Sequence, residues 1–229
     1  MLSDHLNKVI TRIKTRGFRA GVRYIRKRIY STSKFYVLRN NMDKIPEITS
    51  EKFNEFQVIE LTDPECALFH EIIRIWPQET KPCDIQYVTE FLRERSKNGA
   101  MCFVLLHKDK LIGANWLYPP NYYYLNFNIP FLPGEYVSTW TFIVSEYRGM
   151  GVSKFLKSYC LNMAKQRGIP SVISHILVKN TPSIRMNFST GSQIIGMITE
   201  RYRWFKYSHN YTPITPIKDK EQLKKFEGK

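Results

Sequence analysis

The sequence of 229 residues lacks any long, uninterrupted run of apolar residues. A helix that crosses a bilayer needs about 18 or more such residues, so no membrane-spanning helix is expected. The N-terminus also lacks the apolar core of a signal peptide. These absences predict a cytoplasmic protein that makes at most a peripheral contact with the inner face of a membrane.

Cysteine is scarce, and its spacing is irregular. The four cysteines form no CxxC pair and no even ladder of spacings, so we expect reduced thiols that act as small apolar residues. The five histidines show no metal-ligand spacing, and no metal site is expected. The cysteines are Cys66, Cys83, Cys102 and Cys160.

Acidic residues are few relative to basic ones, and the formal net charge is +15. Residues 1–50 hold twelve Lys and Arg against three acids, so the excess lies mainly at the N-terminus. An anionic membrane, a nucleic acid or an acidic ligand would each suit such a segment. Hydrophobic residues make up 43% of the chain, enough for a sizeable core in the remainder.

Apolar residues recur at helical spacing within residues 1–30, with basic residues at most other positions. This pattern predicts two short basic amphipathic helices separated at Gly17. They could lie on an anionic membrane surface, or dock on the main domain with a solvated charged face. We expect a loop at 31–34, a short strand at 35–38 and a linker from 40, so the N-terminal extension is predicted to span residues 1–50.

The segments from 51 to 210 predict one α/β (α+β) domain. A strand at 56–61, two helices within 63–98 and a hairpin of two strands within 101–118 come first. A further strand is predicted at 122–127, where three successive tyrosines could stack on a base or sugar or serve ordinary packing. The polar tail, 211–229, is expected to be loose.

The clearest helical periodicity lies in residues 151–167, which follow a predicted strand at 136–144. One stripe of this helix is apolar, and four polar residues are expected to face away from it. The apolar stripe is Val152, Phe155, Leu156, Tyr159, Cys160, Met163 and Ala164, and the outward residues are Lys154, Lys157, Asn162 and Lys165.

The stretch YRGMGVS, residues 147–153, joins that strand to the helix. The first amides of a helix lack partners and carry partial positive charge, and glycines let an anion approach the backbone. With the charge of Arg148, the turn suits a phosphate or pyrophosphate, although glycines can also serve turn geometry alone. The chain lacks a P-loop GxxxxGK motif, a third glycine and a following acid, which argues against ATP and NAD.

The order of elements and two motifs together resemble the GNAT acetyltransferases. The family motif is Gln or Arg-x-x-Gly-x-Gly or Ala, and Arg148, Gly151 and Ser153 occupy its defined positions, with a serine as the last small residue. Asn180, Ser183 and Gly191 match a second family pattern downstream. The resemblance covers residues 52–207 and implies a mixed, mostly antiparallel twisted sheet flanked by helices.

The resemblance also implies acetyl-CoA or another acyl-CoA as the donor. Backbone amides of residues 148–153 would hold its pyrophosphate, and the end of the preceding strand would pair with the pantetheine arm. An amide near Ile143 would polarise the thioester carbonyl. The implied CoA-contacting residues are Thr141, Phe142, Ile143, Arg148, Gly149, Met150, Gly151, Val152, Ser153, Asn180 and Ser183.

The identities of the general acid and base remain open. Many family members have a tyrosine seven residues after the asparagine that protonates the leaving thiolate, but Asn187 stands here. The proton could come from elsewhere, or the thiolate could leave unassisted. The candidate bases are His175, which titrates near neutral pH unless it points to the opposite face, and Glu135, unless it is a solvated loop residue.

We therefore expect an N-acetyltransferase that acts on a small-molecule or glycan amine by direct attack on the thioester. An amino sugar or glycan precursor in surface-polysaccharide assembly is one candidate acceptor. The alternative is an inactive GNAT-like binding module that uses its basic arm on nucleic acid or an anionic membrane. Nucleic acid is disfavoured because no RNP, KH or helix-turn-helix pattern occurs. The oligomeric state is not predicted.

Overall fold

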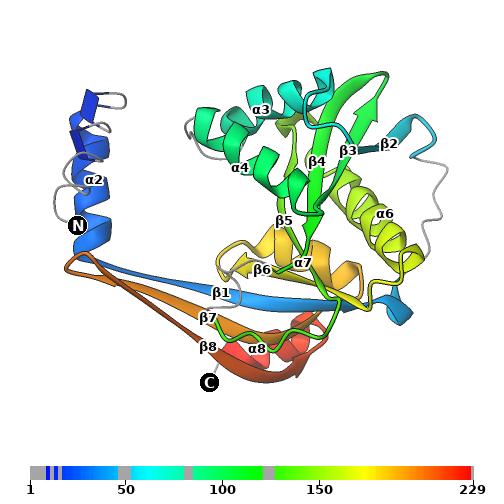
Figure 1. The fold of residues 1–229 in the computed structure, drawn as a ribbon. Helices are drawn as coiled ribbons and strands as arrows, with labels where there is room; N and C mark the ends of the chain where they lie inside the picture. Colours follow the sequence, from blue (N-terminus) through cyan, green and yellow to red (C-terminus); the bar gives the residue numbers. More distant parts are fainter. Residues whose placement is uncertain are drawn as a thin grey trace.

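The computed structural model describes residues 9–10, 13–14, 17–45, 53–79, 85–120 and 127–227. Cys83 and the tyrosine run Tyr122–Tyr124 lie outside these described residues. Within them, eight strands form one sheet in the order β2-β3-β4-β5-β6-β1-β7-β8 (Figure 1). Every neighbouring pair is antiparallel except β5 and β6, so the predicted mixed, mostly antiparallel sheet is confirmed.

The elements follow one another along the chain as helical and extended segments. The strands are β1 (Tyr30–Asn41), β2 (Phe56–Leu61), β3 (Met101–His107), β4 (Lys110–Tyr118), β5 (Tyr136–Ile143), β6 (Ser171–Leu177), β7 (Gln193–Arg203) and β8 (Lys206–Ile217). The helices are α2 (Phe18–Ile29), α3 (Ala67–Glu79), α4 (Ile85–Lys97), α6 (Val152–Gln166), α7 (Thr181–Ser189) and α8 (Lys220–Glu227), with short 3₁₀ turns η1 (Met42–Lys44) and η3 (Ser145–Tyr147).

Helices α3 and α6 cover opposite faces of the sheet. Trp116 on β4 meets Phe69 of α3 edge-on, with ring centroids 6.2 Å apart. Asn115 points to the other face because successive strand residues alternate, and its cross-strand neighbour Phe103 contacts Tyr159 of α6 on that side. Coverage of both faces explains why β3 and β4 are buried almost throughout.

The one parallel pair, β5 and β6, separates after two residues. Its recorded register joins only Tyr136 to Val172 and Val137 to Ile173. A bulge where β4 pairs with β5, between Ala114 and Trp116, marks the bend of β5 away from its regular course. Beyond Val137 the two strands diverge, and the opening between them positions the site described below.

Strand β1 corrects the predicted boundary of the N-terminal extension. Residues 31–34 were expected to be a loop and 40–50 a linker, but Tyr30–Asn41 is a single strand between β6 and β7. Its apolar part, from Phe35, pairs with both neighbours, whereas the polar part before it pairs with β7 alone and is more exposed. The polar composition therefore reflects the missing second neighbour, not a loop.

The C-terminal segment is also more ordered than the polar composition predicts. The tail from residue 211 was expected to be loose, but β8 pairs with β7 as far as Ile217. Helix α8 follows, and its Leu223 packs with Ile217 and Ile184 in a small apolar cluster. Pro213 is tolerated because β8 is an edge strand, where a missing N–H need not interrupt a second ladder.

Helix α2 stands at the far end of the long strands β1, β7 and β8, away from α3, α4 and α6 (Figure 1). The β7–β8 turn secures its C-terminus: the Trp204 amide donates to the Ile29 carbonyl at 2.8 Å, and the Phe205 amide to the Arg28 carbonyl at 2.9 Å. In the part of the chain that the structure describes, no helix is long and apolar enough to cross a bilayer.

Candidate active site

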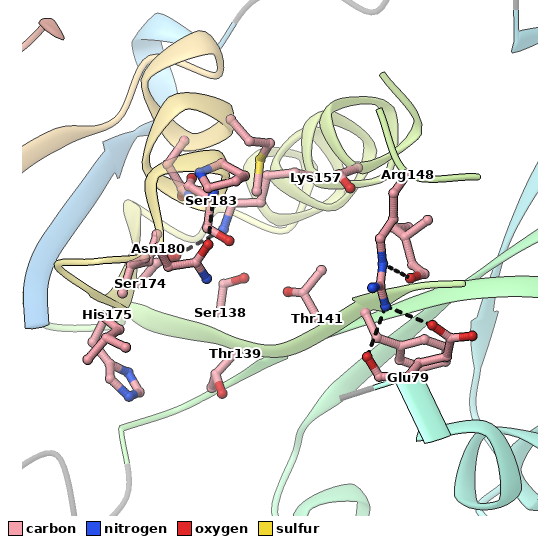
Figure 2. A pocket seen from close by; sticks show the side chains of 18 of the residues that line it. Glu79, Ser138, Thr139, Thr141, Arg148, Lys157, Ser174, His175, Asn180 and Ser183 are labelled. Carbon is pink, nitrogen blue, oxygen red and sulfur yellow. Dashed lines mark hydrogen bonds and ion pairs between the residues drawn. The ribbon is translucent and has the colours of Figure 1, made fainter. Parts of the chain in front are cut away.

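A cavity of about 620 Å³ lies where β5 and β6 diverge. Strand β5, the start of α6, strand β6 and helix α7 form its walls (Figure 2). Most of the residues implied by the sequence motifs line it: Thr141, Phe142, Ile143, Arg148, Gly149, Ser153, Asn180 and Ser183. Two segments about 30 residues apart in the chain, the glycine turn and the start of α7, are thus brought to one opening.

The glycine turn ends in a helix start with uncapped amides. Gly149 and Gly151 both have positive φ, 82° and 84°, which side chains disfavour. Gly151 is the N-cap of α6 and has no side chain to accept a bond from the first amides. A Cβ added at Gly149 would meet nothing within 4 Å, so the backbone there is open to an anion.

Of the other two residues of this turn, Val152 anchors it through its side chain and Met150 is exposed. Val152 is 1% exposed and belongs to the main core, so only its backbone is available to a ligand. Met150 is 45% exposed and does not line the cavity. The buried side chain of Val152 thus fixes the turn to the core, while the backbone of the turn stays at the surface.

Arg148 is not the free charge that the sequence predicted. Its Nη2 donates to Glu79 Oε2 at 2.7 Å, and its Nε donates to the Ile143 carbonyl at 2.8 Å (Figure 2). Glu79 also accepts from the Ser145 amide at 3.0 Å. The ion pair ties the end of α3 to the end of β5 and balances the arginine, so the uncapped helix amides supply most of the attraction for an anion.

The hydroxyl groups of β5 are organised by a buried asparagine that sequence reasoning missed. Asn115 Oδ1 accepts from Thr141 Oγ1 at 2.6 Å and from Ser138 Oγ at 3.1 Å. Asn115 is fully buried. A polar residue in the otherwise apolar strand LIGANWLY was the feature of the sequence that could have identified it. The hydroxyl groups of Ser138 and Thr141 are both bonded to Asn115, so β5 presents its backbone edge to the cavity.

The start of α7 explains the Asn-x-x-Ser spacing. Asn180 is the N-cap, and its Oδ1 accepts from the Ser183 amide at 3.4 Å. Both residues therefore have a structural role as well as a place on the cavity wall. Asn187, where the family often has tyrosine, is buried and donates from Nδ2 to the Ser183 carbonyl at 2.9 Å. It has no ionisable proton to give.

The two candidate bases lie in different places. His175 lines the cavity, and its ring packs against Phe35 with centroids 5.6 Å apart. Burial lowers the pKa of His175 to about 4, so the imidazole is neutral at pH 7 and a weak base.

Glu135 is neither a solvated loop residue nor a cavity residue. Its carboxylate is buried and accepts from Arg39 Nε at 2.7 Å, from the Leu132 amide at 3.0 Å and from the Ser171 hydroxyl. These contacts hold the loop before β5 against β1 and β6, and the structure does not bring Glu135 to the site.

Lys157 overturns a prediction for α6. It was expected to face solvent, but it is 2% exposed and lines the cavity, where its Nζ donates to Ser174 Oγ at 3.1 Å. Burial lowers its pKa to about 8. The signal was present in the sequence, because Cys160, Leu161 and Ala164 follow at the i+3, i+4 and i+7 positions of one helix face.

Comparisons with known proteins agree with this geometry. A family model described as the acetyltransferase (GNAT) family matches residues 66–187, just over half of the chain. A search of curated proteins gave no match.

Solved structures share the fold. A GNAT-family acetyltransferase from Colwellia psychrerythraea matches with a TM-score of 0.58 at 12% identity, over 88% of this chain and 72% of that one. A conserved protein of unknown function from Staphylococcus epidermidis gives 0.57 at 10% identity, over 78% and 64%. A GCN5-related N-acetyltransferase from Sphaerobacter thermophilus gives 0.54 at 13% identity, over 88% and 58%. This chain thus spans less than two thirds of the length of the last two.

Proposed function

Because the chain belongs to the GNAT acetyltransferase family, we propose that it transfers an acetyl group from acetyl-CoA to a primary amine. The observation that supports this most strongly is the cavity between diverging β5 and β6, which ends at the uncapped glycine turn of α6. A plain strand-to-helix turn would not need an opened sheet beside it.

The residues present suit an acyl-CoA in two respects. The space beside Gly149 is open, and the first amides of α6, which follow Gly151, have no side-chain cap, so the turn favours a pyrophosphate. The edge of β5 beyond Val137 has no β6 partner, so its backbone groups are available to the amides of a pantetheine arm. When bound, acetyl-CoA supplies an activated thioester. The protein binds and orients the two substrates and moves protons between them and its own side chains.

Direct attack by the amine fits the side chains at the site. Cys160, the cysteine of α6, is buried, and burial raises its pKa to about 12. A thiol in that state is not a nucleophile at neutral pH. Ser138 and Thr141 donate their hydroxyl protons to Asn115 and are likewise not activated. We therefore propose no covalent enzyme intermediate.

We retain His175 as the side chain that accepts a proton from the attacking amine, because it is uncharged and lies on the cavity wall. For the acceptor we propose a small-molecule or glycan amine. The net charge of +15 favours an acceptor that is itself anionic, such as a nucleotide-linked or lipid-linked amino sugar used in surface-polysaccharide assembly.

We also propose a peripheral contact of the basic N-terminal segment with an anionic membrane, on the cytoplasmic side. Phe18 is 71% exposed, Val22 on the same face of α2 is 45% exposed, and Trp204 at the adjoining hairpin tip is 76% exposed. Basic residues surround them on α2 and the hairpin: Arg19, Arg23, Arg26, Lys27, Arg201, Arg203 and Lys206. Exposed aromatic side chains among cations are typical of membrane-surface helices.

A binding assay followed by a turnover screen tests the enzymatic proposal. Acetyl-CoA should raise the melting temperature of the protein, and a panel of amines should then reveal one that releases CoA. The competing function is an inactive binding module, which the neutral Asn187 favours. Protection by acetyl-CoA without turnover on any amine would support that module, and the absence of protection would exclude acetyl-CoA as a ligand.

A further inference from the structure

In the part of the chain that the structure describes, the buried cation Lys157 has no carboxylate as counter-charge. Its side chain is 2% exposed, and transfer of an ammonium group from water to a protein interior costs several kcal/mol unless it is paired. Its recorded hydrogen bond is the one to Ser174 Oγ. Across the described residues, no carboxylate forms an ion pair with Lys157, and the carboxylates of Glu79 and Glu135 pair with Arg148 and Arg39.

The Nζ of Lys157 lies at the point where the two strands part. Its partner Ser174 directly follows Ile173, the last residue of β6 that pairs with β5. An ammonium group has three donors, and Ser174 accepts one of them. Lys157 reaches from α6 under the opening toward Ser174, with Ser138 and Asn180 close by (Figure 2). The remaining donors are therefore placed for a ligand in the cavity.

We propose that Lys157 is the general acid of the acyl transfer, an inference that rests on the proposed function. The amine nitrogen forms a bond to the acetyl carbonyl carbon, and the C–S bond breaks with its electron pair on sulfur. A proton moves from Lys157 Nζ to that sulfur and gives free CoA thiol. The attacking nitrogen loses its proton to His175, which releases it to solvent, and solvent reprotonates Lys157 before the next turnover.

The electrostatics favour this role because the anion appears only as the reaction proceeds. In the free protein the cation is poorly compensated, and a developing thiolate beside it is stabilised in the transition state more than in the ground state. Burial lowers the pKa of Lys157 to about 8, close to the value of about 8.5 for an ordinary thiol. Proton transfer between groups so closely matched needs little free energy.

The described groups that neighbour Lys157 do not supply a competing charge. Cys160 on α6 and His175 on β6 are neutral at pH 7, since burial raises the pKa of the thiol and lowers that of the imidazole. At the mouth, Glu79 and Arg148 neutralise each other. On α7, Asn187 is a neutral amide already bonded to the helix backbone. Among the described residues that line the cavity, Lys157 is therefore the one that has a proton to donate and a charge that its neighbours do not balance.

The test measures the thiol pKa of bound CoA, which needs no acceptor amine. Ultraviolet absorption of the thiolate is followed against pH, with desulfo-CoA as the blank. Bound to the wild type, the thiol should titrate at least about one unit below its free value of about 8.5. Lys157→Met should abolish this shift, Lys157→Arg should keep it because the charge remains, and exposed Lys165→Met should behave as the wild type.

The outcomes separate the two proposals. Failure of the wild type to bind CoA would overturn the proposed function itself. CoA that binds equally well to the wild type and Lys157→Met, with one and the same thiol pKa, would overturn only the role of Lys157. If Lys157→Met instead weakens succinyl-CoA far more than CoA and leaves the thiol pKa unchanged, the lysine recognises an acyl carboxylate and is not the acid.

Discussion

The two buried charges Glu135 and Lys157 differ in how far their surroundings satisfy them with hydrogen bonds. Glu135 is surrounded by donors from three segments of the chain, which is the usual state of a structural ion pair. Among the described residues, Lys157 has the Ser174 hydroxyl as its partner, and it faces a cavity. A buried group that is left incompletely satisfied is a common feature of functional sites.

Replacement of Lys157 by methionine should stabilise the fold at neutral pH. The folded pKa of about 8 lies below the ordinary value of 10.5, so the charged form destabilises the native state. This penalty, about 3 kcal/mol, is complete below pH 8 and disappears as the pH rises to 10.5. Urea unfolding should show Lys157→Met as more stable at pH 7 and equal to the wild type near pH 10.5. Lower stability at pH 7 would contradict the burial of a charged lysine.

Replacement of Glu135 by glutamine should have the opposite effect. It leaves Arg39, which is 17% exposed, without its anionic partner, and the free energy of unfolding should fall by about 3 kcal/mol. The folded variant should still bind acetyl-CoA, because Glu135 does not line the cavity. Exposed Glu146→Gln is the control and should change stability by less than about 1 kcal/mol. Loss of turnover with unchanged stability would restore Glu135 as a base.

Prediction from the sequence was best for residues whose backbone chemistry is local. Gly149, Gly151, Asn180 and Ser183 were identified from turn and cap patterns, and the structure brings them to one cavity or its rim. Lys157 was missed because lysine is expected at the surface, although its helix face is apolar. Glu79 and Asn115 were missed because their partners are 69 and 26 residues away at the furthest, beyond the reach of local patterns.

Helix α2 and the β7–β8 hairpin form one apolar and basic end of the molecule. Hydrogen bonds from the Trp204 and Phe205 amides to the last carbonyls of α2 fix the two elements to each other. Arg28 lies over the ring of Tyr202, 4.0 Å from its centroid, and strengthens the junction. The exposed side chains of Phe18 and Trp204 are therefore presented on a supported end and not on a free helix.

This end should bind vesicles that contain phosphatidylserine. Trp204→Ser combined with Phe18→Ser should reduce binding by at least about tenfold, since each aromatic contributes about 1.5–3 kcal/mol when buried in the lipid interface. The matched control is Leu132→Ser, an apolar residue that is 46% exposed on another part of the surface. Cosedimentation at low and high salt gives the measurement. Equal binding by all three proteins would remove the membrane proposal.

Helices and strands were predicted correctly where the sequence pattern and the contacts that it reflects are close together in the chain. They were missed where a strand pairs with a partner that is distant in the chain. The α6 helix and the β3–β4 hairpin were predicted and are confirmed, and so is the family to which the chain belongs. Of strand β1 only residues 35–38 were predicted, because its first residues are polar and its partners, β6 and β7, lie at least 130 residues later. The same holds for β8, whose strand character depends on pairing with β7.

The molecule as a whole depends on β1, which joins the half of the sheet that holds the cavity to the half that reaches α2. Removal of residues 1–29 should leave the sheet intact, so the shortened protein should unfold cooperatively and still bind acetyl-CoA. Removal of residues 1–50 takes β1 from between β6 and β7 and should prevent folding. Circular dichroism and thermal melting compare the two. A folded protein without residues 1–50 would contradict the central place of β1.

The opening between β5 and β6, with its glycine turn, is the acyl-CoA site that we propose. Gly151→Asp places bulk and negative charge at the N-cap of α6, whereas Gly168→Asp places them at the far end of the same helix. Both glycines have positive φ, 84° and 72°, so the backbone strain is comparable. The measurement is titration calorimetry of acetyl-CoA with both variants and the wild type. We expect binding to the wild type and Gly168→Asp and none to folded Gly151→Asp; undiminished binding to Gly151→Asp would contradict the account.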